Sequence, residues 1–196
     1  MATPSDISVG LVHELAITAC KVGWEPKDFA TLAHSEDKLR ELLPFVRGCG
    51  EITVIRHLID CDADPFTPNG WKVEEHRKGG ELTWDQTKVN LYLSSNQIGD
   101  RVIKGDKLRR ELASEPVLNA NVLDYLFAHP DLIPEEWKVD AEGRTRYIFF
   151  WGTIYRDSGG GLCVRCLYWY GGRWLWFCDW LAHGWYVDGP AALLAS

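Results

Sequence analysis

The chain has 196 residues, a formal charge of −7 at neutral pH and a pI near 5.4. Its length allows one domain, or one domain with a small appendage. The acidic balance argues against DNA or RNA as a partner, because proteins that bind a phosphate backbone concentrate positive charge.

The first residues and the cysteines bear on the compartment. The chain does not open with a basic segment followed by a long apolar one, and no apolar run reaches the roughly 18 residues of a membrane-spanning helix. Six cysteines are spread over a chain large enough to fold without disulfides. We therefore expect free thiols, a cytoplasmic location and no membrane insertion, while the sequence indicates no particular oligomeric state.

The N-terminal third is rich in helical patterns. Apolar residues recur at helical spacing and predict three short helices, at Leu11, Leu15 and Ala16, at Phe29, Leu32 and Ala33, and at Leu39, Leu42 and Leu43. The stretch ITVIRHLI (52–59) fits either a strand or a further short helix. The prolines, acids and Asn-Gly pair of CDADPFTPNGW (61–71) predict a turn-rich linker. We therefore expect a helical N-terminal region over 1–65 and a second domain over 66–196.

The second domain contains strand-like and helix-like segments. The expected strands are WKVEEH (71–76), LTWDQTKVNLYL (82–93), RYIFFWGTIYR (146–156) and LCVRCLYW (162–169), and the expected helices are DKLRRELA (106–113) and LNANVLDYLFAH (118–129). Glycine-rich turns at 78–80 and 157–161 divide the strands into two pairs, and Asp106 and Asn119 are the expected N-caps. This order predicts an α+β architecture with helices against one antiparallel sheet.

Cys163, Cys166, Cys178 and His183 are the strongest candidates for a metal site. A Cys-x-x-Cys pair followed by Cys and His resembles a structural zinc set. However, Cys163 and Cys166 fall in an expected strand, where positions three apart face opposite sides of the sheet. A zinc-stabilised domain is therefore an alternative, and the main expectation is that the protein has no metal site and no other cofactor.

Other motifs do not indicate an enzyme. Asp60, Asp62 and Asp64 could hold calcium or magnesium, but the following residues lack the glycine and distant glutamate of an EF-hand loop, which favours a turn. No serine stands in a Gly-x-Ser-x-Gly elbow, and the glycines at 159–161 are not followed by the lysine of a phosphate loop. We expect no catalytic residues.

The stretch GGRWLWFCDWLAHGWYVDGP (171–190) combines regularity with variety. Four tryptophans recur in it, at Trp174, Trp176, Trp180 and Trp185, while the residues between them share no chemistry. A buried strand would fill these gaps with apolar residues and an exposed loop with polar ones. We expect the tryptophans to lie inside, buried or half-buried with their indole N–H groups paired where buried, and the intervening residues to lie outside.

The run IFFWGTIYRDSGGGLCVRCLYWYGGRWLWFCDWLAHGWYVDGPAALLAS (148–196) resembles the C-terminal variable region of diversity-generating retroelement variable proteins. In that family a reverse transcriptase copies a template repeat with errors at adenines, and the copy replaces the matching part of the variable gene. An AAC codon altered at its adenines cannot become Trp, Met, Lys, Glu or Gln, and the last four are absent between Gly143 and Ser196. The resemblance implies a C-type lectin fold for 66–196, with a variable segment over about 163–189.

The resemblance also implies roles for individual residues. It assigns variant-specific ligand binding to Tyr170, Arg173, Leu175, Phe177, Cys178, Asp179, Ala182, His183, Tyr186, Val187 and Asp188, and a constant scaffold to Trp169, Trp174, Trp176, Trp180 and Trp185. The implied function is a ligand-binding display protein whose partner is a protein or another macromolecule. A conventional carbohydrate-binding lectin is an alternative, although calcium ligands of such lectins are not recognisable here.

Overall fold

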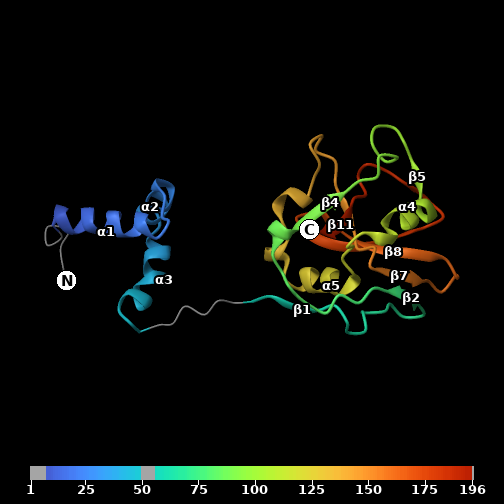
Figure 1. Cartoon of the computed structure of the whole chain (residues 1–196), viewed down its shortest axis with the longest axis horizontal. Helices are drawn as coiled ribbons and strands as arrows, with labels where there is room; N and C mark the ends of the chain where they lie inside the picture. Colours follow the sequence, from blue (N-terminus) through green and yellow to red (C-terminus); the bar gives the residue numbers. More distant parts are fainter. Residues whose placement is uncertain (1–7, 50–55, 196) are drawn as a thin grey trace. The chain divides into compact units, whose positions relative to one another are not determined.

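The structure, a computed structural model, describes residues 8–49 and 56–195. The chain consists of two compact units, Met1–Ile55 and Arg56–Ser196 (Figure 1). Most of the stretch ITVIRHLI lies outside the described residues.

The N-terminal unit contains the three predicted helices. They are α1 (Val9–Lys21), α2 (Pro26–Ala33) and α3 (Glu36–Val46). Ser8 and Ser35 cap the first and third helices by accepting hydrogen bonds from backbone N–H groups. Among residues 8–49, Ala19 alone is buried, so this unit keeps most of its apolar side chains exposed.

The C-terminal unit is built on a curled sheet of seven strands. The strands are β2 (Lys72–His76), β4 (Val89–Tyr92), β6 (Tyr147–Phe149), β7 (Thr153–Arg156), β8 (Leu162–Tyr170), β9 (Arg173–Trp180) and β11 (Ala191–Leu194). They run in the order β2-β7-β8-β6-β11-β4, and β9 also pairs with β8. All pairs are antiparallel except the bridge between β6 and β11. Two short pairs lie outside this sheet, β1 (Leu58–Asp60) with β3 (Glu81–Thr83) and β5 (Ile103–Lys104) with β10 (Gly184–Trp185).

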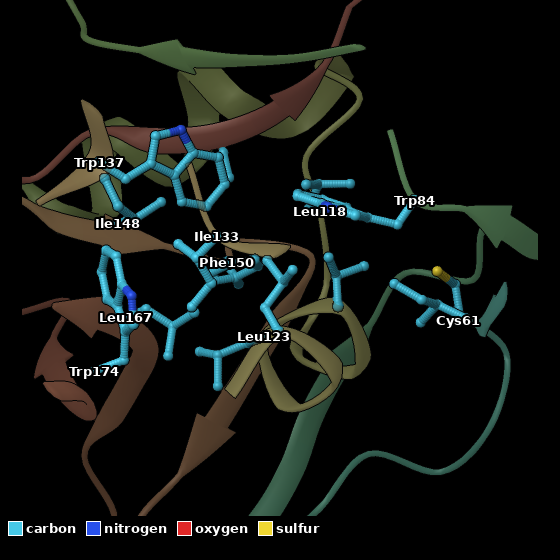
Figure 2. Close-up of a cluster of buried hydrophobic side chains, with 14 residues drawn as sticks. Cys61, Trp84, Leu118, Leu123, Ile133, Trp137, Ile148, Phe150, Leu167 and Trp174 are labelled. Atoms are coloured by element: carbon cyan, nitrogen blue, oxygen red, sulfur yellow. The ribbon is translucent and has the colours of Figure 1, made fainter. Parts of the chain in front are cut away.

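Helices complete the core of this unit. They are α4 (Gly105–Glu111) and α5 (Ala120–Ala128), with single 3-10 turns at Gln86–Lys88, Leu112–Ser114, Pro130–Leu132 and Glu135–Trp137. Asn119 caps α5, as predicted. Leu123 of α5 lies in one buried cluster with Ile148 and Leu167 of the sheet and with Trp174 (Figure 2). The mixture of helices and one curled sheet confirms the predicted α+β class.

The strand pairing differs from the prediction at the first glycine turn. β2 and β3 do not pair with each other, because β2 joins β7 and β3 joins β1. Asp62 accepts hydrogen bonds from the N–H groups of Gly79 and Gly80 and so ties this turn to the preceding loop. Since β1 belongs to the C-terminal unit, that unit begins about ten residues before the expected boundary at residue 66.

Two smaller expectations are also corrected. Lys104, not Asp106, occupies the N-cap position of α4, and Asp106 lies in its first turn. The segment 146–156 forms two strands, β6 and β7, because the chain turns between them, where Thr153 N–H donates to the carbonyl of Phe150.

Candidate functional site

The hairpin of β8 and β9 sorts the residues of the tryptophan-rich stretch by face. Successive side chains of a strand point to opposite sides of a sheet, so odd-numbered and even-numbered residues of β9 separate. One face carries Arg173, Leu175, Phe177 and Asp179, and the other carries Trp174, Trp176, Cys178 and Trp180. The even-numbered face packs on the core below α5.

The tryptophans are buried or half-buried, as predicted. Trp174 is buried and meets Trp169 edge-on, with ring centroids 5.5 Å apart. Trp176 is half-buried beneath the guanidinium of Arg165, 4.4 Å from its ring centroid. Trp180 is half-buried, and its indole N–H donates to Asp157 Oδ2 at 2.6 Å. This hydrogen bond is the main cause that lowers the pKa of Asp157.

Trp185 departs from the expectation about paired indoles. It is 2% exposed and packs against Phe149 and Trp151, with ring centroids 4.3 and 4.6 Å away. Its Nε1 has no hydrogen-bond partner among the described residues. The indole lies against the start of α4, where a Cβ on Gly105 would be 2.6 Å from Nε1. Close packing therefore takes precedence over a hydrogen bond at this position.

A hollow of about 580 Å³ opens on the face opposite α5. Five aromatic residues line it: Phe149 and Trp185 are buried and are called its floor here, while Tyr147 is half-buried and Phe177 and Tyr186 are exposed. Its remaining lining residues are Lys104, Asp179, Ala182, His183, Gly184, Asp188 and Gly189. The volume falls within the approximately 300–1,000 Å³ typical of ligand pockets.

The polar side chains that line the hollow differ in their hydrogen-bond partners. Asp179 Oδ1 accepts hydrogen bonds from Trp180 N–H and pairs with His183 Nδ1, each at 2.7 Å. Lys104 Nζ donates to the carbonyl of Ala182 at 3.3 Å. Burial raises the pKa of the Asp188 carboxyl, while the nearby charge of Arg144 lowers it.

Gln97 holds the loop on one side of the hollow. Its fully buried side chain donates to the carbonyls of Tyr186 and Gly189, at 2.8 and 3.1 Å, and accepts from Ser94 N–H. No sequence pattern indicated Gln97, because it lies in a polar stretch without periodicity. Tyr147 and Phe149 were also missed, although their alternation with Ile148 in a predicted strand indicated that they share a face.

The expected ligand-binding residues are distributed over more than one face of the sheet. Six of them line the hollow, namely Phe177, Asp179, Ala182, His183, Tyr186 and Asp188. Val187 lines a neighbouring hollow of about 330 Å³ that shares Tyr186 and Asp188. Arg173, at the end of the hairpin, lines a third hollow of about 460 Å³ with Trp169, Trp174 and Phe127 of α5, so this hollow lies on the α5 side of the sheet. Tyr170 is 69% exposed at the end of the hairpin, and Leu175 is half-buried on the face of Phe177.

Cys178 is the exception, and its expected place on the ligand-binding face is wrong. It is an even-numbered residue of β9, so it points into the core, where it lies with Cys163, Tyr155 and Ala120. Residues 163–167, at the start of the expected variable segment, are also buried. The exposed part of that segment therefore begins after residue 167.

The structure does not assemble the four-residue zinc set. Cys163 lies beside Cys178, Cys166 belongs to a different buried cluster, and His183 is exposed beside Asp179. Over residues 8–49 and 56–195, no group of three His, Cys, Asp or Glu side chains is arranged to hold a metal ion. The physical reason is the strand geometry of β8, which turns Cys163 and Cys166 to opposite faces.

The acidic loop after β1 forms turns, as predicted. Asp60 Oδ1 accepts hydrogen bonds from the N–H groups of Asp62 and Ala63, at 2.9 and 3.2 Å. Asp62 Oδ1 accepts from Gly79 and Gly80, both at 2.9 Å. These oxygens therefore satisfy the backbone of their own loop.

Comparison with family models, with curated proteins and with solved structures found no match to this chain. None of the helices in the described part of the chain is long and apolar enough to cross a membrane. The functional conclusion therefore depends on the residues and the geometry of the face described above.

Proposed function

We propose that the C-terminal unit is a ligand-binding display module and not an enzyme. In this proposal it has a C-type lectin-like fold, and a retroelement diversifies its surface by mutating adenines. The observation that carries the proposal is the separation of β9 into two faces. Trp174 and Trp176 of β9 pack on the buried cluster beneath α5, while Leu175, Phe177 and Asp179 lie on the opposite face.

The packing of the hollow agrees with a constant buried scaffold that carries variable exposed residues. Its floor consists of buried aromatic residues. The other lining residues, here called the rim, are mostly ones that an altered AAC codon can encode. A scaffold that accepts many sequences at given positions cannot depend on those positions for its core. Cys178 does not fit the scheme and belongs with the buried scaffold in this variant.

A protein is the ligand class that the rim fits best. Phe177 and Tyr186 are 46% and 56% exposed and offer rigid aromatic contact area. Asp179 and His183 add directional polar groups beside them. Aromatic anchors combined with a few polar contacts are typical of surfaces that recognise proteins.

The DNA that flanks the gene tests the proposal directly. We expect a reverse transcriptase gene nearby and a template repeat that matches the codons for about 163–189 except at adenines. The tryptophan codons should be identical in the two repeats, because they contain no adenine. A flanking region without such a repeat, or a repeat that differs equally at all four bases, would contradict the proposal.

A further inference from the structure

Asp188 is a charged residue of the hollow whose carboxylate lacks an ion-pair partner among the described residues. Arg144 lies near it, and Lys104 and His183 line the same hollow, but each has another partner. Arg144 pairs with Asp140 and Glu142, His183 pairs with Asp179, and Lys104 binds the carbonyl of Ala182. The half-buried Asp188 carboxylate therefore forms no direct ion pair among the described residues, although the charge of Arg144 acts on it.

The surroundings of Asp188 are aromatic. Tyr147 contributes its ring from β6, and its backbone N–H donates to the carbonyl of Asp188 at 2.8 Å. Tyr186 and Phe177 line the same hollow from the loop and from β9. Asp179 adds a second carboxylate to the lining, and Lys104 is the one permanently cationic side chain in it. A hollow with these properties offers aromatic faces and negative charge together.

We propose that this hollow binds the guanidinium group of an arginine side chain presented by a protein ligand, with Asp188 as its carboxylate partner. A guanidinium stacks on aromatic rings and forms charge-assisted hydrogen bonds with carboxylates, so it uses both properties at once. This inference rests on the proposed function and names the ligand chemistry of this variant.

The chain contains an internal example of the same recognition. The guanidinium of Arg165 lies over the ring of Trp176, and its Nη1 and Nη2 donate to the two carboxylate oxygens of Asp124, at 3.0 and 2.7 Å. That site is closed and filled by the chain itself. The hollow at Asp188 has the same kinds of groups and is open to solvent.

The pKa of Asp188 provides a second distinguishing property. Burial raises this pKa, so the ionised carboxylate is less favourable in the folded than in the unfolded chain. The stability that the protonated form contributes is fully present below the unfolded pKa and is lost as pH rises through the folded pKa. Ionisation of Asp188 therefore weakens folding relative to its protonated form, so the charged carboxylate does not stabilise the fold.

The test uses small probes and the full chain. Nα-acetyl-arginine amide is titrated against 15N-labelled protein, and Nα-acetyl-citrulline amide serves as the neutral probe of the same shape. We expect the arginine probe to shift the backbone amide signals of residues 182–189 with a dissociation constant of about 1–10 mM. The citrulline probe should bind at least roughly tenfold more weakly.

Variants then assign the effect to Asp188. Asp188→Asn should weaken binding of the arginine probe about tenfold without lowering the melting temperature at neutral pH. Glu81→Gln, which removes one exposed negative charge on β3, is the matched control and should bind the probe as the unmodified chain does.

Several outcomes would overturn the inference. They are equal binding of the two probes, tighter binding of Nα-acetyl-phenylalanine amide, or no binding of any probe. The comparison of arginine with citrulline needs no variant, so it decides the matter even if Asp188→Asn fails to fold. If the arginine probe does not bind but the template repeat is present, the proposed ligand chemistry is wrong and the proposed function is not. If the template repeat is absent, the proposed function is wrong whatever the probes do.

Discussion

Single residues of the tryptophan-rich stretch should respond to mutation according to the face that they occupy. Trp185 is fully packed against Phe149 and Trp151, so Trp185→Ala should lower the free energy of unfolding by about 3–5 kcal/mol. Phe177→Asn and Tyr186→Asn should each change it by about 1 kcal/mol or less, because these side chains are about half exposed. Urea denaturation of the three variants measures the difference. An asparagine variant as unstable as Trp185→Ala would show that the rim is part of the core.

The loop after β9 packs closely against the first residue of α4. A Cβ on Gly105, the first residue of α4, would lie 2.5 Å from Leu181 Cα and 2.6 Å from its carbonyl oxygen. Backbone atoms cannot rotate away as a side chain can, so Gly105→Ala should destabilise the protein by about 1–3 kcal/mol. It should also shift the amide signals of residues 181–186.

Gly159→Ala is the matched control for this change. It also replaces a glycine with alanine, but the added Cβ would approach only Asp157 Oδ1, at 3.4 Å. We expect thermal melts to detect almost no effect of Gly159→Ala. Equal effects of the two substitutions on the melting temperature would show that the close contact between α4 and the loop after β9 does not contribute to the stability of the fold.

At the scale of the whole molecule, the C-terminal unit should fold without the first 55 residues. The boundary between the two compact units falls after Ile55, and the three buried clusters of the C-terminal unit use residues 59–194 alone. A chain of residues 56–196 should therefore melt within about 3 °C of the full chain and bind the arginine probe equally well. A drop of more than about 10 °C in differential scanning calorimetry would mean that the units stabilise each other.

The sequence by itself determined the features that depend on neighbouring residues. These include the three N-terminal helices, the Asn119 cap, the turn at 157–161 and the alternation of tryptophans with other residues along β9. A helix repeats every 3.6 residues and a strand every two, so such patterns are visible in a short stretch. The same alternation could have shown that Cys178 points inward with the tryptophans.

Only the tertiary structure decided which strands pair and which side chains meet. β2 joins β7, about 80 residues away, instead of the adjacent β3, and β3 pairs with β1, which places the start of the C-terminal unit before β1. Asp188 meets Tyr147 because β11 runs beside β6, and Gln97 closes the loop from 89 and 92 residues away. Such contacts depend on the free energy of the whole packed unit, because a strand edge can pair with any compatible strand. The local pattern therefore indicated the faces of β9, and long-range packing assembled the hollow on one of them.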